Sequence, residues 1–229
     1  MKLAIFDIDG TLTETNEVDD KCFVKAFAAS HQITNIETDW TKYTHVTDSG
    51  LLSEIFNQKL GRSPNEEDFL IFKSRFIENL NEYASKDETL FAEVSNAKAM
   101  LEKLKLEKDW AIALATGCFY DSAKLKLEKA KIKVKDFPIG TADDTVSREE
   151  ILRTAIEKSL EKYGLEEFEK IVSIGDGVWD VRTAKNLSLD FVGIASGKRA
   201  EVLREEGANY INKDFRDYEN FLAYLNKLT

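Results

Sequence analysis

Four short and almost uninterrupted apolar runs recur along the chain. They cover residues 3–6, 111–115, 171–174 and 191–194. Strands that are covered on both faces of a parallel sheet have this continuous apolar character, whereas half-exposed strands alternate apolar and polar residues. The four runs therefore predict buried parallel strands, and weaker runs at residues 137–140 and 210–211 are candidates for two more.

Segments with apolar residues at helical spacing separate these runs. They cover residues 94–106, 120–130, 148–163, 178–185, 198–206 and 218–228. Strands that alternate with helices imply right-handed crossovers and helices on both faces of one sheet. The pattern predicts an α/β protein with a Rossmann-like, doubly wound parallel sheet.

One long stretch interrupts this alternation. Between residues 14 and 88 no strand-like run occurs, and apolar residues such as Phe69, Phe72 and Phe76 recur at spacings of three and four. We expect a helical insert at residues 14–88, placed inside a core formed by residues 1–13 and 89–229.

The charge of the chain excludes several classes of partner. Its 229 residues include 32 Lys and Arg against 42 Asp and Glu, so the formal net charge is −10. An acidic surface repels phosphate backbones and anionic lipids, and we therefore expect neither nucleic acid nor a membrane as partner. The apolar start of the chain ends at Asp7, too early for a signal-peptide core, and a cytoplasmic location is the expectation.

Polar residues follow three of the predicted strands. They are Asp7 and Asp9 after the first strand, Thr116 and Gly117 after the second, and Asp176 and Asp180 after the third. Ligands of open parallel sheets bind beyond the carboxyl ends of the strands. The three strand ends therefore predict one shared site.

Four carboxylates at one edge of a sheet require compensation. Two unit charges ~4 Å apart repel each other by roughly 4 kcal/mol at an effective dielectric of 20. Ligands that are all oxygen favour a hard cation, and incomplete protein coordination favours Mg²⁺. A bound Mg²⁺ makes room for a phosphate, to which the Thr116 hydroxyl and the Gly117 backbone N–H can donate. Of Asp7 and Asp9, one can attack as a nucleophile while the other handles a proton.

A basic side chain for the phosphate is predicted at Arg148. Ser147-Arg148-Glu149-Glu150 has the form of a capping box, with Ser147 as N-cap and Glu150 as the third helical residue. Arg148 then lies in the first helical turn, where the helix dipole also favours an anion. Lys158 is the other candidate, but it falls in the middle of the helix.

These residues resemble the motifs of the haloacid dehalogenase superfamily. Asp7-Ile8-Asp9-Gly10-Thr11-Leu12 resembles its first motif, Thr116 its second, and Gly175-Asp176-Gly177-Val178-Trp179-Asp180 its fourth. The helical insert resembles the C1 cap of subfamily I, which includes phosphoglycolate phosphatase and β-phosphoglucomutase. The third motif is usually Lys-Pro, and Arg148-Glu149 departs from it.

The resemblance implies a phosphoaspartate mechanism. Asp7 would attack phosphorus, while Asp9 would protonate the leaving alcohol and then activate water. Mg²⁺ would be held by Asp7, Asp176 and the backbone carbonyl of Asp9, with Asp180 supporting the site, and Thr116 would bind the phosphoryl oxygens.

The sequence therefore predicts a Mg²⁺-dependent phosphatase that acts on a small phosphomonoester. Two alternatives stay open. A sugar phosphomutase of the same superfamily would use the same core, and a non-catalytic phosphate-binding regulatory protein would keep the fold without turnover. The presence of both Asp7 and Asp9 disfavours the regulatory protein, because binding alone does not need the second acid.

Overall fold

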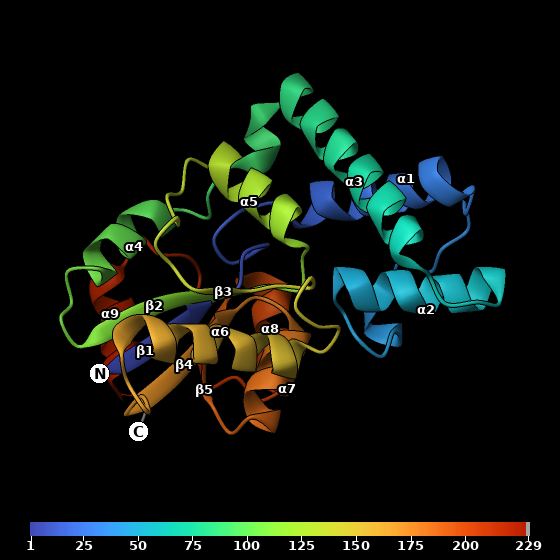
Figure 1. The fold of residues 1–229 in the computed structure, drawn as a ribbon. Helices are drawn as coiled ribbons and strands as arrows, with labels where there is room; N and C mark the ends of the chain where they lie inside the picture. Colours follow the sequence, from blue (N-terminus) through green and yellow to red (C-terminus); the bar gives the residue numbers. More distant parts are fainter. Residues whose placement is uncertain (228–229) are drawn as a thin grey trace.

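A single six-stranded parallel sheet forms the centre of the molecule. The computed structural model describes residues 1–227 and orders the strands β3-β2-β1-β4-β5-β6 (Figure 1). The strands are β1 (Lys2–Phe6), β2 (Trp110–Ala115), β3 (Ile139–Gly140), β4 (Lys170–Gly175), β5 (Asp190–Ile194) and β6 (Tyr210–Asn212). The predicted α/β fold is confirmed, and the order of strands reverses between β1 and β4, where ligands bind in such folds.

Helices cover both faces of the sheet. One face carries α4 (Ala97–Leu104), α5 (Tyr120–Lys129) and α9 (Tyr218–Lys227), and the other carries α6 (Arg148–Tyr163), α7 (Val178–Asn186) and α8 (Gly197–Glu205). Successive side chains of β1 point to opposite faces of the sheet. Phe6 packs in the core beneath α4, α5 and α9, and Ile5 packs in the core beneath α6. Both faces are buried, which explains why the strands have no polar alternation.

The predicted helices exist, with small differences at their ends. The helix predicted from residue 94 begins at Ala97, because Asn96 adopts a left-handed conformation with a φ of 66°. The helix predicted at residues 218–228 is α9, and the last of these residues lies outside the described part of the chain.

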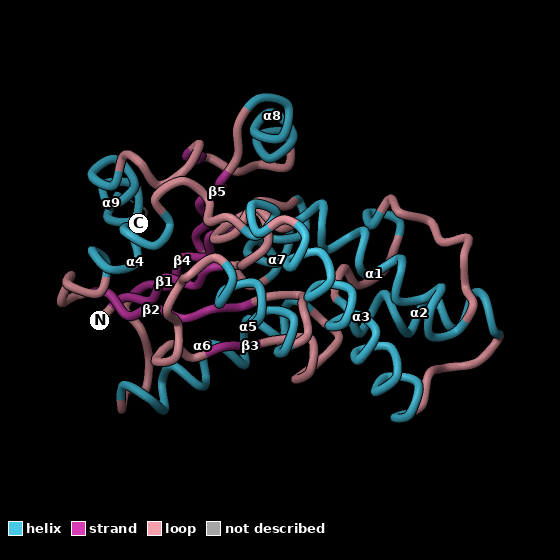
Figure 2. Tube along the Cα trace, turned by 90° about the horizontal axis from the view of Figure 1, so that it is seen from above, coloured by secondary structure: helices cyan, strands magenta, loops and turns pink. Residues whose placement is uncertain are grey.

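Residues 16–86, called the helical insert below, form three helices beyond the carboxyl ends of the strands. They are α1 (Asn16–His31), α2 (Asp48–Leu60) and α3 (Glu66–Lys86), with a short 3-10 turn at Trp40–Lys42, and a second such turn at Glu88–Phe91 follows the insert. Figures 1 and 2 both show α1, α2 and α3 at the same end of the sheet. The insert has its own hydrophobic core, in which Phe23, Phe27 and Phe72 pack with ring centroids 4.6 to 5.3 Å apart.

Two chain segments join the insert to the sheet side by side. The Glu14 amide donates to the Ala92 carbonyl, and the Val94 amide donates to the Leu12 carbonyl, at 2.8 and 2.9 Å. These segments lie close to the predicted boundaries of the insert, residues 14 and 88, which stay a prediction.

The insert rests directly on the loops that follow the strands. The Asp48 amide at the start of α2 donates to the Gly117 carbonyl at 2.7 Å, and the Thr47 hydroxyl donates to the Val146 carbonyl at 2.8 Å. Phe119, from the loop after β2, belongs to the core of the insert. The helices α1 and α2 therefore cover the carboxyl ends of the strands.

The aromatic core of the insert predicts a large effect of its central residue. Phe72→Ala removes a fully buried ring and is expected to lower the free energy of unfolding by about 3 kcal/mol or more, measured by urea titration. Leu70→Ala is the matched control on the same helix, because Leu70 is 69% exposed and its loss should change stability by less than about 0.5 kcal/mol. Equal effects of the two substitutions would contradict this packing.

Candidate active site

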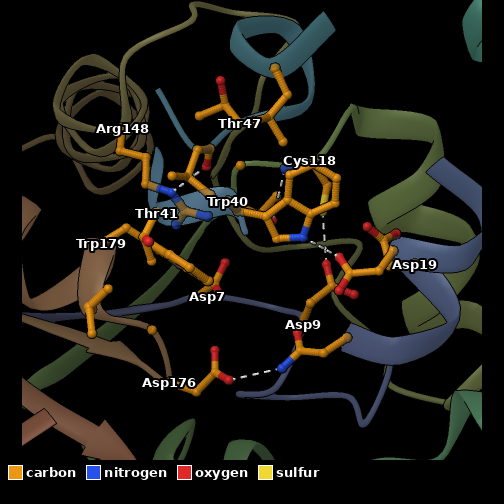
Figure 3. Close-up of a pocket in the computed structure, with 18 of the residues that line it drawn as sticks. Asp7, Asp9, Asp19, Trp40, Thr41, Thr47, Cys118, Arg148, Asp176 and Trp179 are labelled. Carbon is orange, nitrogen blue, oxygen red and sulfur yellow. Dashed lines mark hydrogen bonds between the residues drawn. The ribbon is translucent and has the colours of Figure 1, made fainter. Parts of the chain in front are cut away.

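A cavity of about 340 Å³ lies between the strand ends and the helical insert. Six of the residues predicted from the sequence line this cavity. Five of them follow strands of the sheet and the sixth lies on α6: Asp7, Asp9, Thr116, Gly117, Asp176 and Arg148. In Figure 3, Trp40 and Thr47 of the insert approach from one side, and Asp7, Asp9 and Asp176 approach from the other. The structure therefore brings together side chains that lie up to 169 positions apart in the sequence (7 to 176).

Asp7, Asp176 and Asp180 form a buried carboxylate cluster. Each offers an oxygen atom within 4.8 Å of the others. Burial raises the pKa of Asp7 well above its usual range, and the charges of Asp180 and Asp176 raise it further, while Arg148 lowers it. Burial, followed by the charge of Asp180, raises the pKa of Asp176 to about 7. The three carboxylates are thus unfavourable together as anions unless a positive charge lies among them.

This carboxylate cluster fits a hard divalent cation. Its donors are all oxygen, as Mg²⁺ prefers, and the close approach of Gly10 to Asp176 leaves no space for a Cβ atom there. Gly10 also has a φ of +74°, a conformation that favours glycine. Asp7 and Asp176, two of the residues predicted for the metal, therefore suit it. Asp180 belongs to the cluster but does not line the cavity, and its carboxylate accepts from Arg148 and from the Gly177 amide.

The Asp9 carboxylate lies in a second cluster, with Asp19 and Cys118. At Asp9 only the backbone carbonyl is expected to hold the metal, and that expectation stays a prediction. The Thr15 hydroxyl donates to Asp9 Oδ1, and the Cys118 thiol donates to Asp9 Oδ2 at 2.8 Å. Burial raises the pKa of the Cys118 thiol, so Cys118 acts as a neutral donor.

Lys126 is the main residue of the site that sequence reasoning missed. Its side chain is fully buried, and its Nζ lies 2.6 Å from Asp9 Oδ2, 2.6 Å from Asp19 Oδ1 and 3.0 Å from Cys118 Sγ. A signal was present, because Lys126 occupies the apolar stripe of α5 between Ala123 and Leu127.

The Lys126 ammonium determines the charge of Asp9. Burial alone would raise the pKa of Asp9, but the charge of Lys126 and hydrogen bonds from Cys118, Lys126 and Thr15 outweigh burial and lower it. Asp9 is therefore held as a carboxylate, whereas the surroundings of Asp7 favour protonation until a cation is present.

Arg148 lies at the cavity, as predicted. Its Nη1 donates to Asp180 Oδ1 at 2.7 Å, its Nε donates to the Val46 carbonyl at 2.8 Å, and its guanidinium lies over the Trp179 ring at 5.4 Å. A Cβ atom at Gly117 would meet the Arg148 guanidinium at 2.7 Å and the Val46 backbone carbonyl at 2.9 Å, and the close approach of the backbone favours glycine at that position.

The predicted capping box at Arg148 is only half correct. Ser147 is the N-cap and accepts from the Glu150 amide, but the Ser147 hydroxyl donates to Glu149 at 2.9 Å. Glu150 instead pairs with Arg153 on the next turn. Arg148 still occupies the first turn of α6, because the N-cap alone determines where the helix begins.

Lys158 lies away from the cavity, whereas Arg199 and Thr116 line it. Lys158 contacts Asp144 and the Ile139 carbonyl and does not line the cavity. Arg199 of α8 was not predicted, and its Nη1 donates to Asp176 Oδ2 at 2.8 Å. The Thr116 hydroxyl is buried and accepts from the Cys118 amide at 3.2 Å.

The family model of haloacid dehalogenase-like hydrolases matches residues 1–187. Since this match covers most of the chain, the protein belongs to the haloacid dehalogenase-like hydrolase family. Among curated proteins, none matches the chain.

Solved structures show the same fold. A hydrolase from Pseudomonas syringae has a TM-score of 0.72 at 20% identity and covers 100% of both chains. A family IA hydrolase from Entamoeba histolytica has a TM-score of 0.68 at 17% identity, over 95% of each chain. CbbY from Rhodobacter sphaeroides, in complex with phosphate, has a TM-score of 0.67 at 18% identity, over 94% of this chain and 95% of that one.

Among residues 1–227, the helices all fall short of the combination of length and apolar character that a membrane span requires.

A divalent ion among the carboxylates predicts a metal-dependent stability. Mg²⁺ should raise the midpoint of thermal unfolding of the wild-type protein by at least about 3 °C relative to NaCl of equal ionic strength, because it binds the folded state. Asp176→Asn should remove most of this increase, measured by scanning calorimetry. An unchanged increase in the variant would exclude Asp176 as a ligand.

The raised pKa of Asp48 leads to a separate prediction, that the stability of the protein depends on pH. Burial raises the pKa of Asp48 to about 7, against about 3.9 in an unfolded chain. The folded state therefore retains a proton that the unfolded state loses, and this contribution to stability falls as the pH rises from about 4 to 7.

Asp48→Asn should flatten this pH dependence. The difference in free energy of unfolding, variant minus wild type, should become more positive by at least about 1 kcal/mol from pH 5 to pH 8, measured by urea titrations. The control is Asp121→Asn, at an exposed position of α5. Parallel pH profiles for wild type and Asp48→Asn would refute the assignment.

Proposed function

We propose that this protein is a Mg²⁺-dependent phosphatase that hydrolyses a small phosphomonoester through a phosphoaspartate intermediate. The observation that carries the proposal is the meeting of Asp7, Asp9 and Asp176 with Thr116 and Arg148 around one cavity at the reversal of the strand order. The family assignment supports hydrolytic chemistry.

In this proposal Asp7 is the nucleophile. Its carboxylate lies at the end of β1, where it lines the cavity together with the Thr116 hydroxyl and the Arg148 guanidinium. Thr116 and the Gly117 amide would donate to phosphoryl oxygens, and Arg148 would add a positive charge. When bound between Asp7 and Asp176, Mg²⁺ would supply the positive charge that keeps Asp7 ionised and offsets the charge of the phosphoryl group.

Asp9 is the proposed acid and base. The Lys126 ammonium holds Asp9 as a carboxylate, which suits the removal of a proton from the water that hydrolyses the phosphoaspartate. Protonation of the leaving alcohol requires Asp9 first to take up a proton against the charge of Lys126. Loss of that proton to the alcohol would leave Asp9 as the carboxylate that accepts a proton from the attacking water, and this second transfer would return Asp9 to its protonated form for the next turnover.

The helical insert would serve as the cap. It closes the cavity through contacts such as Asp48 to Gly117 and would exclude bulk water from the phosphoenzyme. The predicted cap boundaries, 14 and 88, fit the paired segments near Glu14 and Ala92. A cytoplasmic location remains part of the proposal.

The pocket favours a phosphatase over a phosphomutase. Phosphoryl transfer to a sugar phosphate creates a sugar with two phosphates, and the second one needs cations at the cap side of the cavity. The insert places Asp19, Asp20 and Asp48 there instead. A purely regulatory protein is disfavoured because Asp9 and its buried partner Lys126 have no use in phosphate binding.

Asp7→Asn tests the proposal. The variant should lose at least about a thousandfold in kcat for Mg²⁺-dependent release of phosphate from para-nitrophenyl phosphate, because an amide cannot attack phosphorus. It should remain folded, since the substitution removes a buried charge. Asp121→Asn is the control, and residual activity near the wild-type level in Asp7→Asn would exclude Asp7 as the nucleophile.

A further inference from the structure

The cap side of the cavity is acidic and aromatic. Asp19 and Asp20 reach it from α1, Asp48 from the start of α2, and Trp40 from the 3-10 turn between these helices. Among the described residues that line the cavity, the cationic side chains are Arg148 and Arg199. Both of them contact the carboxylate cluster on the opposite side, at Asp180 and Asp176.

The nearby Lys126 neutralises this surface only in part, although its charge does act on Asp48 and Asp20. Its ammonium is already bonded to Asp9, Asp19 and Cys118 and is fully buried behind them. Asp19 therefore has a permanent partner, whereas Asp20 and Asp48 have no cationic partner within residues 1–227.

Asp48 is the more deeply buried of these two acids. It is only 6% exposed and lines the cavity. Its Oδ2 accepts from the Phe119 amide at 2.8 Å, whereas its Oδ1 has no hydrogen-bond partner in the described part of the chain. Because Asp48 lines the cavity, this oxygen is available to a donor on a ligand, and a cationic donor would also oppose the raised pKa of Asp48 and favour its carboxylate form.

Trp40 adds an aromatic surface beside the acids. Its Nε1 donates to Asp20 Oδ1 at 2.8 Å, and its ring packs edge-on against Phe23 at a centroid distance of 5.9 Å. These contacts fix the indole at the cavity, where Figure 3 shows it on the cap side. An indole that lines the cavity next to a carboxylate offers an ammonium group an aromatic surface close to a negative charge.

We propose that the leaving group of the substrate carries a protonated amine, which Asp48 and Asp20 bind against the Trp40 indole. This inference rests on the proposed phosphatase function and specifies its substrate class, the phosphomonoesters of amino alcohols and amino sugars. The phosphate lies at the strand ends and the amine at the cap. A carboxylate or second phosphate in the leaving group is rejected by the uncompensated acids.

Matched substrates test the inference. The wild-type kcat/KM for 2-aminoethyl phosphate should exceed that for 2-hydroxyethyl phosphate by about tenfold or more, because hydrogen bonds to charged groups contribute this much binding. Phosphoglycolate, with a carboxylate in the same place, should be the poorest of the three. Glucosamine 6-phosphate and glucose 6-phosphate form a second, larger pair. The inference would be overturned if, in both pairs, the kcat/KM for the hydroxyl substrate equalled or exceeded that for the amine.

Two variants locate the preference in the proposed side chains. Asp48→Asn and Asp20→Asn should each reduce the ratio of amine to hydroxyl kcat/KM by about fivefold or more, since an amide lacks the charge that an ammonium requires. Glu17→Gln is the matched control, because Glu17 belongs to the same helix as Asp20, is 89% exposed and lies outside the lining of the cavity. An unchanged ratio in both aspartate variants would also overturn the inference.

Para-nitrophenyl phosphate separates this inference from the proposed function. Mg²⁺-dependent hydrolysis of this aryl ester without any preference for amines would overturn the amine site and leave the phosphatase standing. The absence of hydrolysis for every ester, including the aryl one, would overturn the phosphatase itself.

Discussion

The repulsion among three buried carboxylates is the constraint on which this site depends. Asp7 and Asp176 follow the adjacent strands β1 and β4, Asp180 lies in the first turn of α7, and the three buried side chains meet within 4.8 Å. Arg148 and Arg199 each contact one member of the cluster and offset part of its charge. The sheet can hold such a group because β1 and β4 are neighbours at the reversal of strand order, and the proposed divalent ion would balance the rest.

The two aspartates of the first motif have opposite surroundings, although they lie two residues apart. Other carboxylates surround Asp7, while Lys126, Cys118 and Thr15 surround Asp9. Their pKa values are therefore displaced in opposite directions, which is how one site assigns different roles to two equivalent groups. The partner of Lys126 on the other side is Asp19 of α1, so the charge of Asp9 is tied to the position of the helical insert.

The strand ends and the first helical turns at Arg148 and Asp180 could be predicted from the sequence, but the contributions from other helical positions could not. Asp7, Thr116 and Asp176 follow continuous apolar runs, and the geometry of parallel sheets brings such positions together. The position of Lys126 in the apolar stripe of α5 indicates burial, but its partner Asp9 and the approach of Arg199 to Asp176 depend on tertiary packing. Asp48, Asp20 and Trp40 belong to the insert, whose placement over the sheet follows from contacts between distant segments.

A crystal structure with Mn²⁺ in place of Mg²⁺ tests the central claim most directly. The anomalous difference map should contain one strong peak between the carboxylates of Asp7 and Asp176, at oxygen distances of about 2.2 Å. A map without a peak there, with the carboxylates of the cluster paired only to Arg148 and Arg199, would contradict the claim that a divalent cation resolves their repulsion.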